Sequence, residues 1–209
     1  MKVNKTAVIL ISFFMLLGIS FLGYYYTTMK QHPRRLPTYG NPGHKVGSFS
    51  FLNQDGKTIT EKDLDGKIYV VEYFFTTCEG ICPIMNENMV AVNNAFKNDN
   101  DFAILSHSVD PEVDTVAQMK KYSFKFDADP ARWMFLTGNK DSLYKMAVDD
   151  YLIPVADSTV EKISPEFIHT QKFVLVDKEK NVRGFYDGTD KASVKKLIAD
   201  IVELKKEYQ

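Results

Sequence analysis

The sequence predicts an α/β fold, in which helices flank a central mixed β-sheet, preceded by an N-terminal transmembrane helix. Residues 7–26 form one uninterrupted apolar run, and strand-like segments alternate with helix-like segments from residue 49 onward. The chain closes with a strand, a polar turn, a second strand and an amphipathic helix. Alternation followed by a terminal hairpin and helix is typical of an α/β sandwich around a mixed sheet.

The apolar run AVILISFFMLLGISFLGYYY, residues 7–26, contains no charged residue. Twenty helical residues span about 30 Å, the thickness of the hydrocarbon core of a bilayer. A cleaved signal peptide is the alternative, but the run is longer than a usual signal core and no A-x-A-like site follows it. We therefore expect residues 1–26 to be an uncleaved membrane anchor, with three tyrosines at the interface.

The segment after the anchor predicts a flexible tether. Residues 27–47 carry three prolines and three glycines without apolar periodicity. We expect the tether over 27–45 and one folded domain over 46–209.

The first half of the expected domain contains a hairpin, a strand and a helix. Segment 49–60 has an Asp-Gly turn between two short strand-like pieces. Segment 67–75, KIYVVEYFF, has apolar residues on both faces, which predicts a central strand buried on both sides. Pro83 suits the first turn of a helix, and apolar residues follow at near-helical spacing as far as Phe96.

The second half continues the alternation. Segment 102–109 predicts a strand, and Asp110 and Pro111 suit the cap and first position of a helix that follows it. Segment 132–138 predicts a strand and 139–151 a helix.

The C-terminal part predicts strand, turn and strand over 171–188 and a helix over 190–208. The only two cysteines, Cys78 and Cys82, then lie after the first long strand, in the loop that enters a helix. A thioredoxin-like fold carries its chemistry at this place.

Composition excludes one class of partner. The chain is 44% hydrophobic and 25% charged with a formal net charge of −1, so a folded domain is expected without a basic field for nucleic acid. Nucleic acid is therefore not expected as a partner.

The sequence FFTTCEGICPIMNENM places three residues between Cys78 and Cys82. A thiol near a helix N-terminus is stabilised as thiolate by unpaired backbone N–H groups, and Cys82, just before Pro83, is expected to be the better placed of the two. Glu79 acts modestly in the opposite direction. Cysteines four positions apart close a very small loop, which disfavours a purely structural disulfide.

Redox turnover and metal binding both stay open on these residues alone. A metal site would need a third ligand, and the chain has four histidines. His32 and His44 lie in the expected tether, and His107 lies inside a strand pattern that is more typical of a core histidine. His169 precedes the strand that begins near residue 171, where a loop imidazole could face the cysteine loop.

The stretches FFTTCEGICPIMNENM, SHSVDPEVDT and IHTQKFVLVDKEKNVRGFYDG resemble the SCO/SenC family of membrane-anchored, copper-binding, thioredoxin-like proteins. The resemblance covers about residues 44–207, and the motifs stand in the family's order. It implies that Cys78, Cys82 and His169 bind copper. Thr77 stands where relatives often have histidine and Glu79 where many have proline or another small residue, which leaves the ligand set intact.

The implied ligands agree with metal chemistry, because two thiolates select soft Cu(I) and an imidazole allows Cu(II) as well. Asp110 and Asp114 are interpreted as helix-start residues, and Asp110 is also a candidate for orienting the site or receiving a partner.

The resemblance further implies a copper metallochaperone that delivers copper to the binuclear copper site of a cytochrome c oxidase, and a reductase function on that partner's thiols. The expected partners are the copper-bearing oxidase subunit, other copper chaperones and thiol reductases. We expect the domain on the outer, non-cytoplasmic face, and the lack of an Arg- and Ser-rich leader favours a bacterial envelope. The alternative function is a thiol-disulfide oxidoreductase that uses Cys78 and Cys82 without a metal.

Overall fold

The computed structural model describes residues 4–31, 35–153 and 170–209. The chain divides into two compact units, Met1–Arg35 and Leu36–Gln209. The first contains helix α1, Lys5–Gln31, in which Lys5–Tyr26 is long and apolar enough to cross a membrane. By length and composition, α1 therefore meets the expectation of a transmembrane helix.

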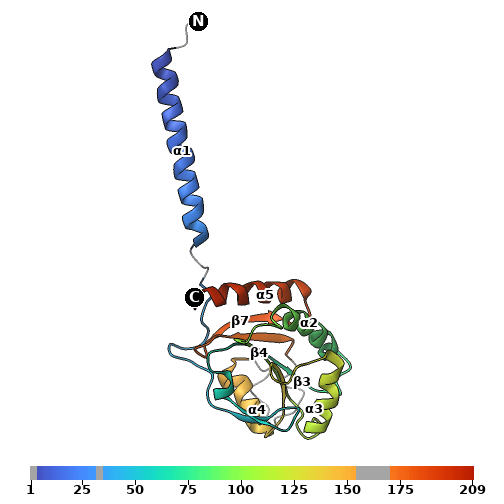
Figure 1. Cartoon of the computed structure of the whole chain (residues 1–209). Helices are drawn as coiled ribbons and strands as arrows, with labels where there is room; N and C mark the ends of the chain where they lie inside the picture. Colours follow the sequence, from blue (N-terminus) through green and yellow to red (C-terminus); the bar gives the residue numbers. More distant parts are fainter. Residues whose placement is uncertain (1–3, 32–34, 154–169) are drawn as a thin grey trace. The chain divides into compact units, whose positions relative to one another are not determined.

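The second unit is built on a five-stranded mixed sheet (Figure 1). Its strands run in the spatial order β5-β4-β3-β6-β7. Their bounds are β3 Ile68–Phe74, β4 Phe102–Ser108, β5 Trp133–Leu136, β6 Lys172–Val176 and β7 Val182–Asp187. β3, β4 and β5 are parallel, whereas β6 pairs antiparallel with both β3 and β7. The predicted α/β class, with a central mixed sheet, is thereby confirmed.

The helices and a small hairpin cover the two faces of this sheet. The helices are α2 Ile81–Ala95, α3 Val116–Ser123, α4 Lys140–Lys145 and α5 Lys191–Lys206, with short turns η1 Glu61–Leu64, η2 Phe124–Phe126 and η3 Met146–Asp150. The hairpin pairs β1, Ser50–Leu52, with β2, Thr58–Thr60. The elements expected over 49–60, 67–75, 139–151 and 171–188 are all present.

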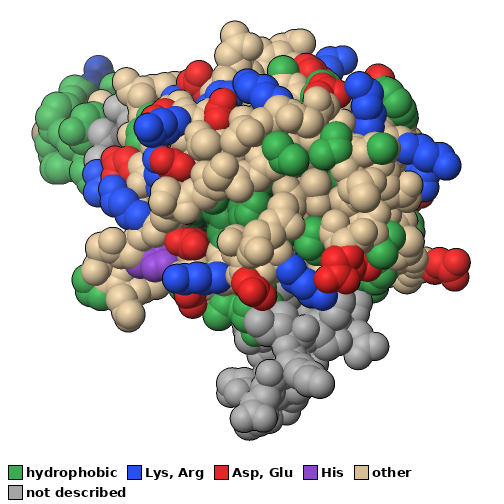
Figure 2. Space-filling model, turned by 90° about the horizontal axis from the view of Figure 1, so that it is seen from below, with side chains coloured by type: hydrophobic (Ala, Val, Ile, Leu, Met, Phe, Trp, Pro, Cys, Tyr) green, Lys and Arg blue, Asp and Glu red, His purple; other side chains and the backbone are tan. Residues whose placement is uncertain are grey.

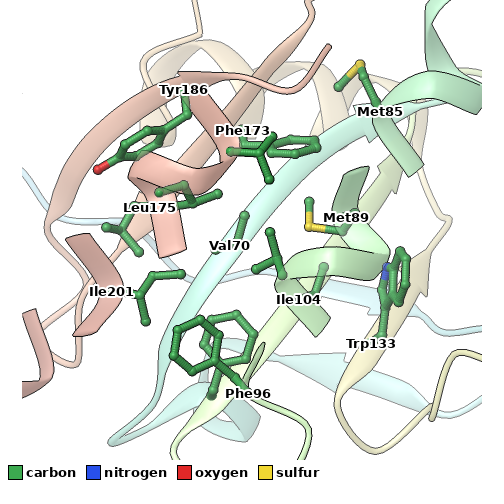
Figure 3. Close-up of a cluster of buried hydrophobic side chains, with 14 of the residues drawn as sticks. Val70, Met85, Met89, Phe96, Ile104, Trp133, Phe173, Leu175, Tyr186 and Ile201 are labelled. Carbon is green, nitrogen blue, oxygen red and sulfur yellow. The ribbon is translucent and has the colours of Figure 1, made fainter. Parts of the chain in front are cut away.

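Two apolar clusters form, one on each face of the sheet, because successive side chains of a strand point to opposite faces. Figure 3 shows the first cluster, where Val70 and Ile104 of the central strands lie between Met89 of α2 and Ile201 of α5. The second cluster packs the opposite side chains of β3 against the hairpin and α4. All seven residues of β3 are buried, as expected for a central strand.

The compact unit begins at Leu36, which precedes Val46, the expected start of the domain. Leu36 is buried, and its backbone N–H donates to Glu207 Oε1 at 2.9 Å. The buried guanidinium of Arg183 donates to the carbonyls of Leu36 and Pro37 at 2.7 and 3.0 Å. Arg183 also pairs with Glu207 and Asp177 at 2.8 Å each, so an ionic group far along the chain holds residues 36 and 37 to the domain.

Candidate metal and redox centre

Cys78 and Cys82 meet at the junction of β3 and α2. β3 ends at Phe74 and α2 begins at Ile81, with Gly80 as its N-cap residue. Cys78 therefore precedes the helix, and Cys82 is its second residue. Pro83 occupies the first turn of α2, where its missing N–H leaves no intrahelical bond unmade, as the sequence predicts.

Cys78 is the thiol that favours the ionised form. Its side chain is half-buried. Partial burial opposes ionisation, but hydrogen bonds from the Cys82 thiol and from the backbone N–H groups of Cys82, Gly80 and Ile81 outweigh it and lower the pKa of Cys78 below its ordinary value. The first N–H groups of a helix have no intrahelical acceptor, so they are free to stabilise this sulfur.

Cys82 is the thiol that favours the protonated form. Its side chain is 3% exposed, and burial, followed by the hydrogen bond to Cys78, raises the pKa of Cys82 to about 12. The expectation that Cys82 is the better placed thiolate is therefore wrong. Because α2 begins before Cys82, this side chain turns into the core cluster, while Cys78 lies where the N–H groups of the first turn point.

A buried carboxyl group also acts on Cys82. Glu72, in the middle of β3, is 0% exposed and accepts a hydrogen bond from Ser106 Oγ at 2.6 Å. Trp133 Nε1 donates to Ser106 Oγ in turn, at 2.9 Å. The charge of Glu72 contributes to the raised pKa of both Cys82 and Tyr122. Sequence reasoning missed Glu72, although a glutamate within the run VVEYFF is itself a signal.

Asp114 fixes the loop that carries Cys78. Its fully buried carboxylate accepts hydrogen bonds from Ser108 Oγ at 2.5 Å, Thr76 Oγ1 at 2.5 Å and the Thr76 backbone N–H at 3.1 Å. Burial raises the pKa of Asp114, and the bonds from Ser108 and Thr76 oppose that rise. Gln118 Nε2 of α3 also donates to Thr76 Oγ1, at 3.2 Å, so the residue two positions before Cys78 is held on two sides.

The expected helix start at Asp110 is a second correction. The structure forms a turn over residues 110–114, in which the N–H groups of Val113 and Asp114 donate to the Asp110 carbonyl at 3.1 and 2.8 Å. α3 begins only at Val116, capped by Thr115, whose hydroxyl accepts from the Gln118 N–H. A helix from Asp110 is not formed because Asp114 turns inward to its hydrogen-bond donors. Asp110, half-buried, thus shapes the turn through its backbone.

The candidate third ligand, His169, lies outside the described residues. In the described part of the chain, no group of three His, Cys, Asp or Glu side chains is arranged to hold a metal ion. His107 is a core residue, as expected: its ring stacks on Tyr73 with centroids 5.0 Å apart, and burial lowers its pKa to about 3. His44 binds the Asp150 carbonyl through Nε2 at 2.9 Å.

Comparison with known proteins identifies the family. The model of the SCO1/SenC family matches residues 37–206. The chain belongs to the SCO1/SenC family. The SCO1 protein homolog of Bacillus subtilis is 32% identical over 161 residues, which cover 76% of this chain and 81% of that protein. The family resemblance stated from the sequence motifs is therefore confirmed.

Solved structures confirm the thioredoxin-like fold of this SCO1/SenC protein. BsSco, described with a disulfide switch and as a member of the Sco family of cytochrome c oxidase assembly proteins, is 29% identical with a TM-score of 0.66, covering 83% of this chain and 98% of its own. Arabidopsis thaliana ScoI with copper bound is 29% identical with a TM-score of 0.61, covering 78% and 99%. Sco proteins are thus tied to oxidase assembly, and homologues hold copper.

Proposed function

We propose that this SCO1/SenC protein is a membrane-anchored copper metallochaperone, which binds copper through Cys78, Cys82 and His169 and delivers it to the binuclear copper site of a cytochrome c oxidase. One observation carries the proposal: two free thiols meet at the start of α2, one of them favoured as thiolate. Two sulfurs at one place suit Cu(I), and an added imidazole would extend binding to Cu(II). Asp110 would help to position the loop or receive the partner.

Competition titration tests the ligand set. Cu(I) is titrated against a chelator in the reduced full-length protein, and Cu(II) is followed by its absorption. We expect Cys78→Ser and Cys82→Ser to weaken Cu(I) binding more than His169→Ala, because each removes a thiolate. His44→Ala is the matched control, since His44 contacts a backbone carbonyl away from the cysteines. Unchanged affinity for both copper ions in His169→Ala would remove His169 from the ligand set.

A second function, thiol-disulfide exchange without a metal, is favoured by the asymmetry of the two thiols. The half-buried Cys78 thiolate would attack a substrate disulfide, forming a mixed disulfide and releasing one substrate thiolate. Cys82 would then attack the Cys78 sulfur, releasing the second substrate thiol and leaving a Cys78–Cys82 disulfide. The substrate gains the two electrons that the cysteines lose, and an external thiol restores them.

An insulin-reduction assay on metal-free protein separates the two functions. Turnover comparable to that of a thioredoxin, together with negligible copper affinity, would favour the oxidoreductase. Copper binding with slow turnover would favour the metallochaperone.

We also propose that the domain lies on the outer, non-cytoplasmic face of the membrane, to which α1 anchors it. A protease that does not cross membranes should cut the domain only from that side. Protection in intact cells and in cells with an opened outer envelope, followed by cleavage after lysis, would place the domain in the cytoplasm instead.

A further inference from the structure

Helix α5 buries one face and leaves the opposite face exposed. In Figure 1 it lies at the top of the domain, beside β7. Its buried side chains, which belong mainly to the first apolar cluster, are Val194, Leu197, Asp200, Ile201 and Leu204. Four residues follow one another at steps of four, seven and four, so they share one side of the helix, and all are exposed. This outer stripe of α5 consists of Lys191, Lys195, Val202 and Lys206.

The outer stripe carries positive charge. Every exposed charged residue of α5 is a lysine. The two carboxylates of the helix, Asp200 and Glu203, are less exposed, and each pairs with a lysine of the same helix. Lys191 and Lys195 have no ion-pair partner among the described residues. The stripe therefore presents at least two positive charges that no carboxylate of the described chain neutralises.

The charge of the whole domain is of the opposite sign. All 27 acidic residues of the chain lie in Leu36–Gln209, together with only 21 of its 26 basic residues. The domain is therefore acidic overall, although the exposed charges of α5 are basic only. Figure 2 views the domain from the side away from α5, and there Lys and Arg side chains are interspersed among Asp and Glu. A basic stripe on an acidic domain points to an anionic binding partner.

The chain joins α5 to the membrane anchor through a short connection. α1 ends at Gln31, and Leu36 is bound through its backbone N–H to Glu207, the residue that follows α5. Five residues span at most about 18 Å when the chain is fully extended. An α1 that lies in a bilayer would therefore keep the C-terminal end of α5 within reach of the lipid headgroups.

We infer that the outer stripe of α5 binds anionic phospholipid headgroups of the membrane that holds α1. The ammonium groups of Lys191 and Lys195 contact the phosphates, while their aliphatic stems and Val202 lie against the boundary between headgroups and acyl chains. The inference rests on the proposed anchoring and adds a second, electrostatic attachment that belongs to the domain itself. A membrane is favoured over an acidic protein because the anchor holds the domain next to a lipid surface at all times.

Acetylation of lysines in the wild-type, full-length protein measures this contact. The protein is placed in lipid nanodiscs of phosphatidylcholine alone or of an equal mixture of phosphatidylcholine and phosphatidylglycerol, and mass spectrometry gives the rate at each lysine. We expect Lys191 and Lys195 to react about fivefold more slowly in the anionic discs, a ratio that corresponds to about 1 kcal/mol per lysine at an anionic surface. High salt should remove this protection. Lys121, an exposed lysine of α3, is the control and should react equally fast in both discs.

Lys195→Glu and Lys121→Glu form a matched pair of charge reversals. Both lysines are exposed on helices and have no ion-pair partner among the described residues. We expect Lys195→Glu to reduce the protection of Lys191 in the anionic discs from about fivefold to under about twofold, because the neighbouring negative charge repels the headgroups. Lys121→Glu should leave the protection of Lys191 unchanged.

Equal acetylation rates of Lys191 and Lys195 in the two kinds of disc would overturn the inference and would make an acidic protein the candidate partner of the stripe. Equal protection of Lys191 in the two glutamate variants would overturn it as well. The proposed anchoring fails in a different way. Release of the protein from membranes by alkaline carbonate would refute the anchor and the inference together, whereas equal rates in protein that carbonate does not release would refute the inference alone.

Discussion

Replacing Glu72 with glutamine should remove a pH dependence of stability that the wild-type protein carries in its core. Glu72 is fully buried, and its Oε2 atom has no hydrogen-bond partner among the described residues. Burial raises the pKa of Glu72 to about 7, although the hydrogen bond from Ser106 acts in the opposite direction. The folded protein therefore binds this proton more tightly than the unfolded chain does.

The magnitude follows from the two pKa values. The ordinary pKa is 4.5, so below that pH the carboxyl group is neutral in both states and burial of a charge costs nothing. As pH rises from 4.5 to about 7, the unfolded chain releases the proton while the folded protein retains it, so the free energy of unfolding falls. Each tenfold difference in proton affinity is worth about 1.4 kcal/mol, which gives a total loss of about 3 kcal/mol.

Urea unfolding of reduced, metal-free protein between pH 5 and pH 8 measures this loss. Glu72→Gln keeps the oxygen that accepts from Ser106 and cannot ionise, so the wild type should lose about 2.5 kcal/mol more than the variant across this range, which takes in most of the total loss. Glu112→Gln, at an exposed position, is the control and should follow the wild type. Parallel curves for wild type and Glu72→Gln would refute the reasoning.

Four further outcomes are expected. Iodoacetamide should alkylate Cys78 faster than Cys82 at neutral pH, since the pKa of Cys78 is lowered and that of Cys82 raised; equal rates by mass spectrometry would contradict this. Burial lowers the pKa of His107 to about 3, so below pH 6.5 the unfolded chain takes up a proton that the folded protein does not, and the free energy of unfolding falls with the pH. In urea unfolding, His107→Phe should therefore lose less free energy of unfolding than the wild type between pH 7 and pH 4. Asp114→Asn should lower the free energy of unfolding by about 1–3 kcal/mol and weaken Cu(I) binding in the competition titration, because an amide leaves one of its buried donors unpaired. Arg183→Met should cost about 3–5 kcal/mol in the same unfolding assay, because two carboxylates lose their buried partner; a loss under 1 kcal/mol would contradict it.

The strands and the cysteine loop could be predicted because their signals are local. The run KIYVVEYFF is long enough to be read as a buried strand, and Pro83 marks the helix that follows. That Cys78 rather than Cys82 favours the thiolate could not be predicted in this way. The difference depends on the exact residue at which α2 begins, because this residue decides whether the Cys82 side chain faces the core.

Other features depend on contacts distant in sequence. Asp114 in DPEVDT is interpreted from the sequence as part of a helix start. Only the parallel pairing of β3 with β4 brings Thr76, which follows β3, to Asp114, which follows β4. Similarly, Leu36 is placed by Arg183, which lies 147 positions later. A local sequence pattern cannot predict contacts between residues so far apart in the chain. The start of the compact unit and the hydrogen bonds that support the cysteine loop are therefore visible only in the folded structure.

The hydrogen bonds of Thr76 have a mechanical consequence. Its hydroxyl donates to Asp114 and accepts from Gln118 of α3, while α3 also carries Tyr122, which lines a groove beside Cys78. The hydroxyl group of Thr76 therefore links the cysteine loop to α3, the helix that forms one wall of the groove. A shift of the loop when its sulfurs change partner would be transmitted to that wall, so the width of the groove would vary with the state of the sulfurs.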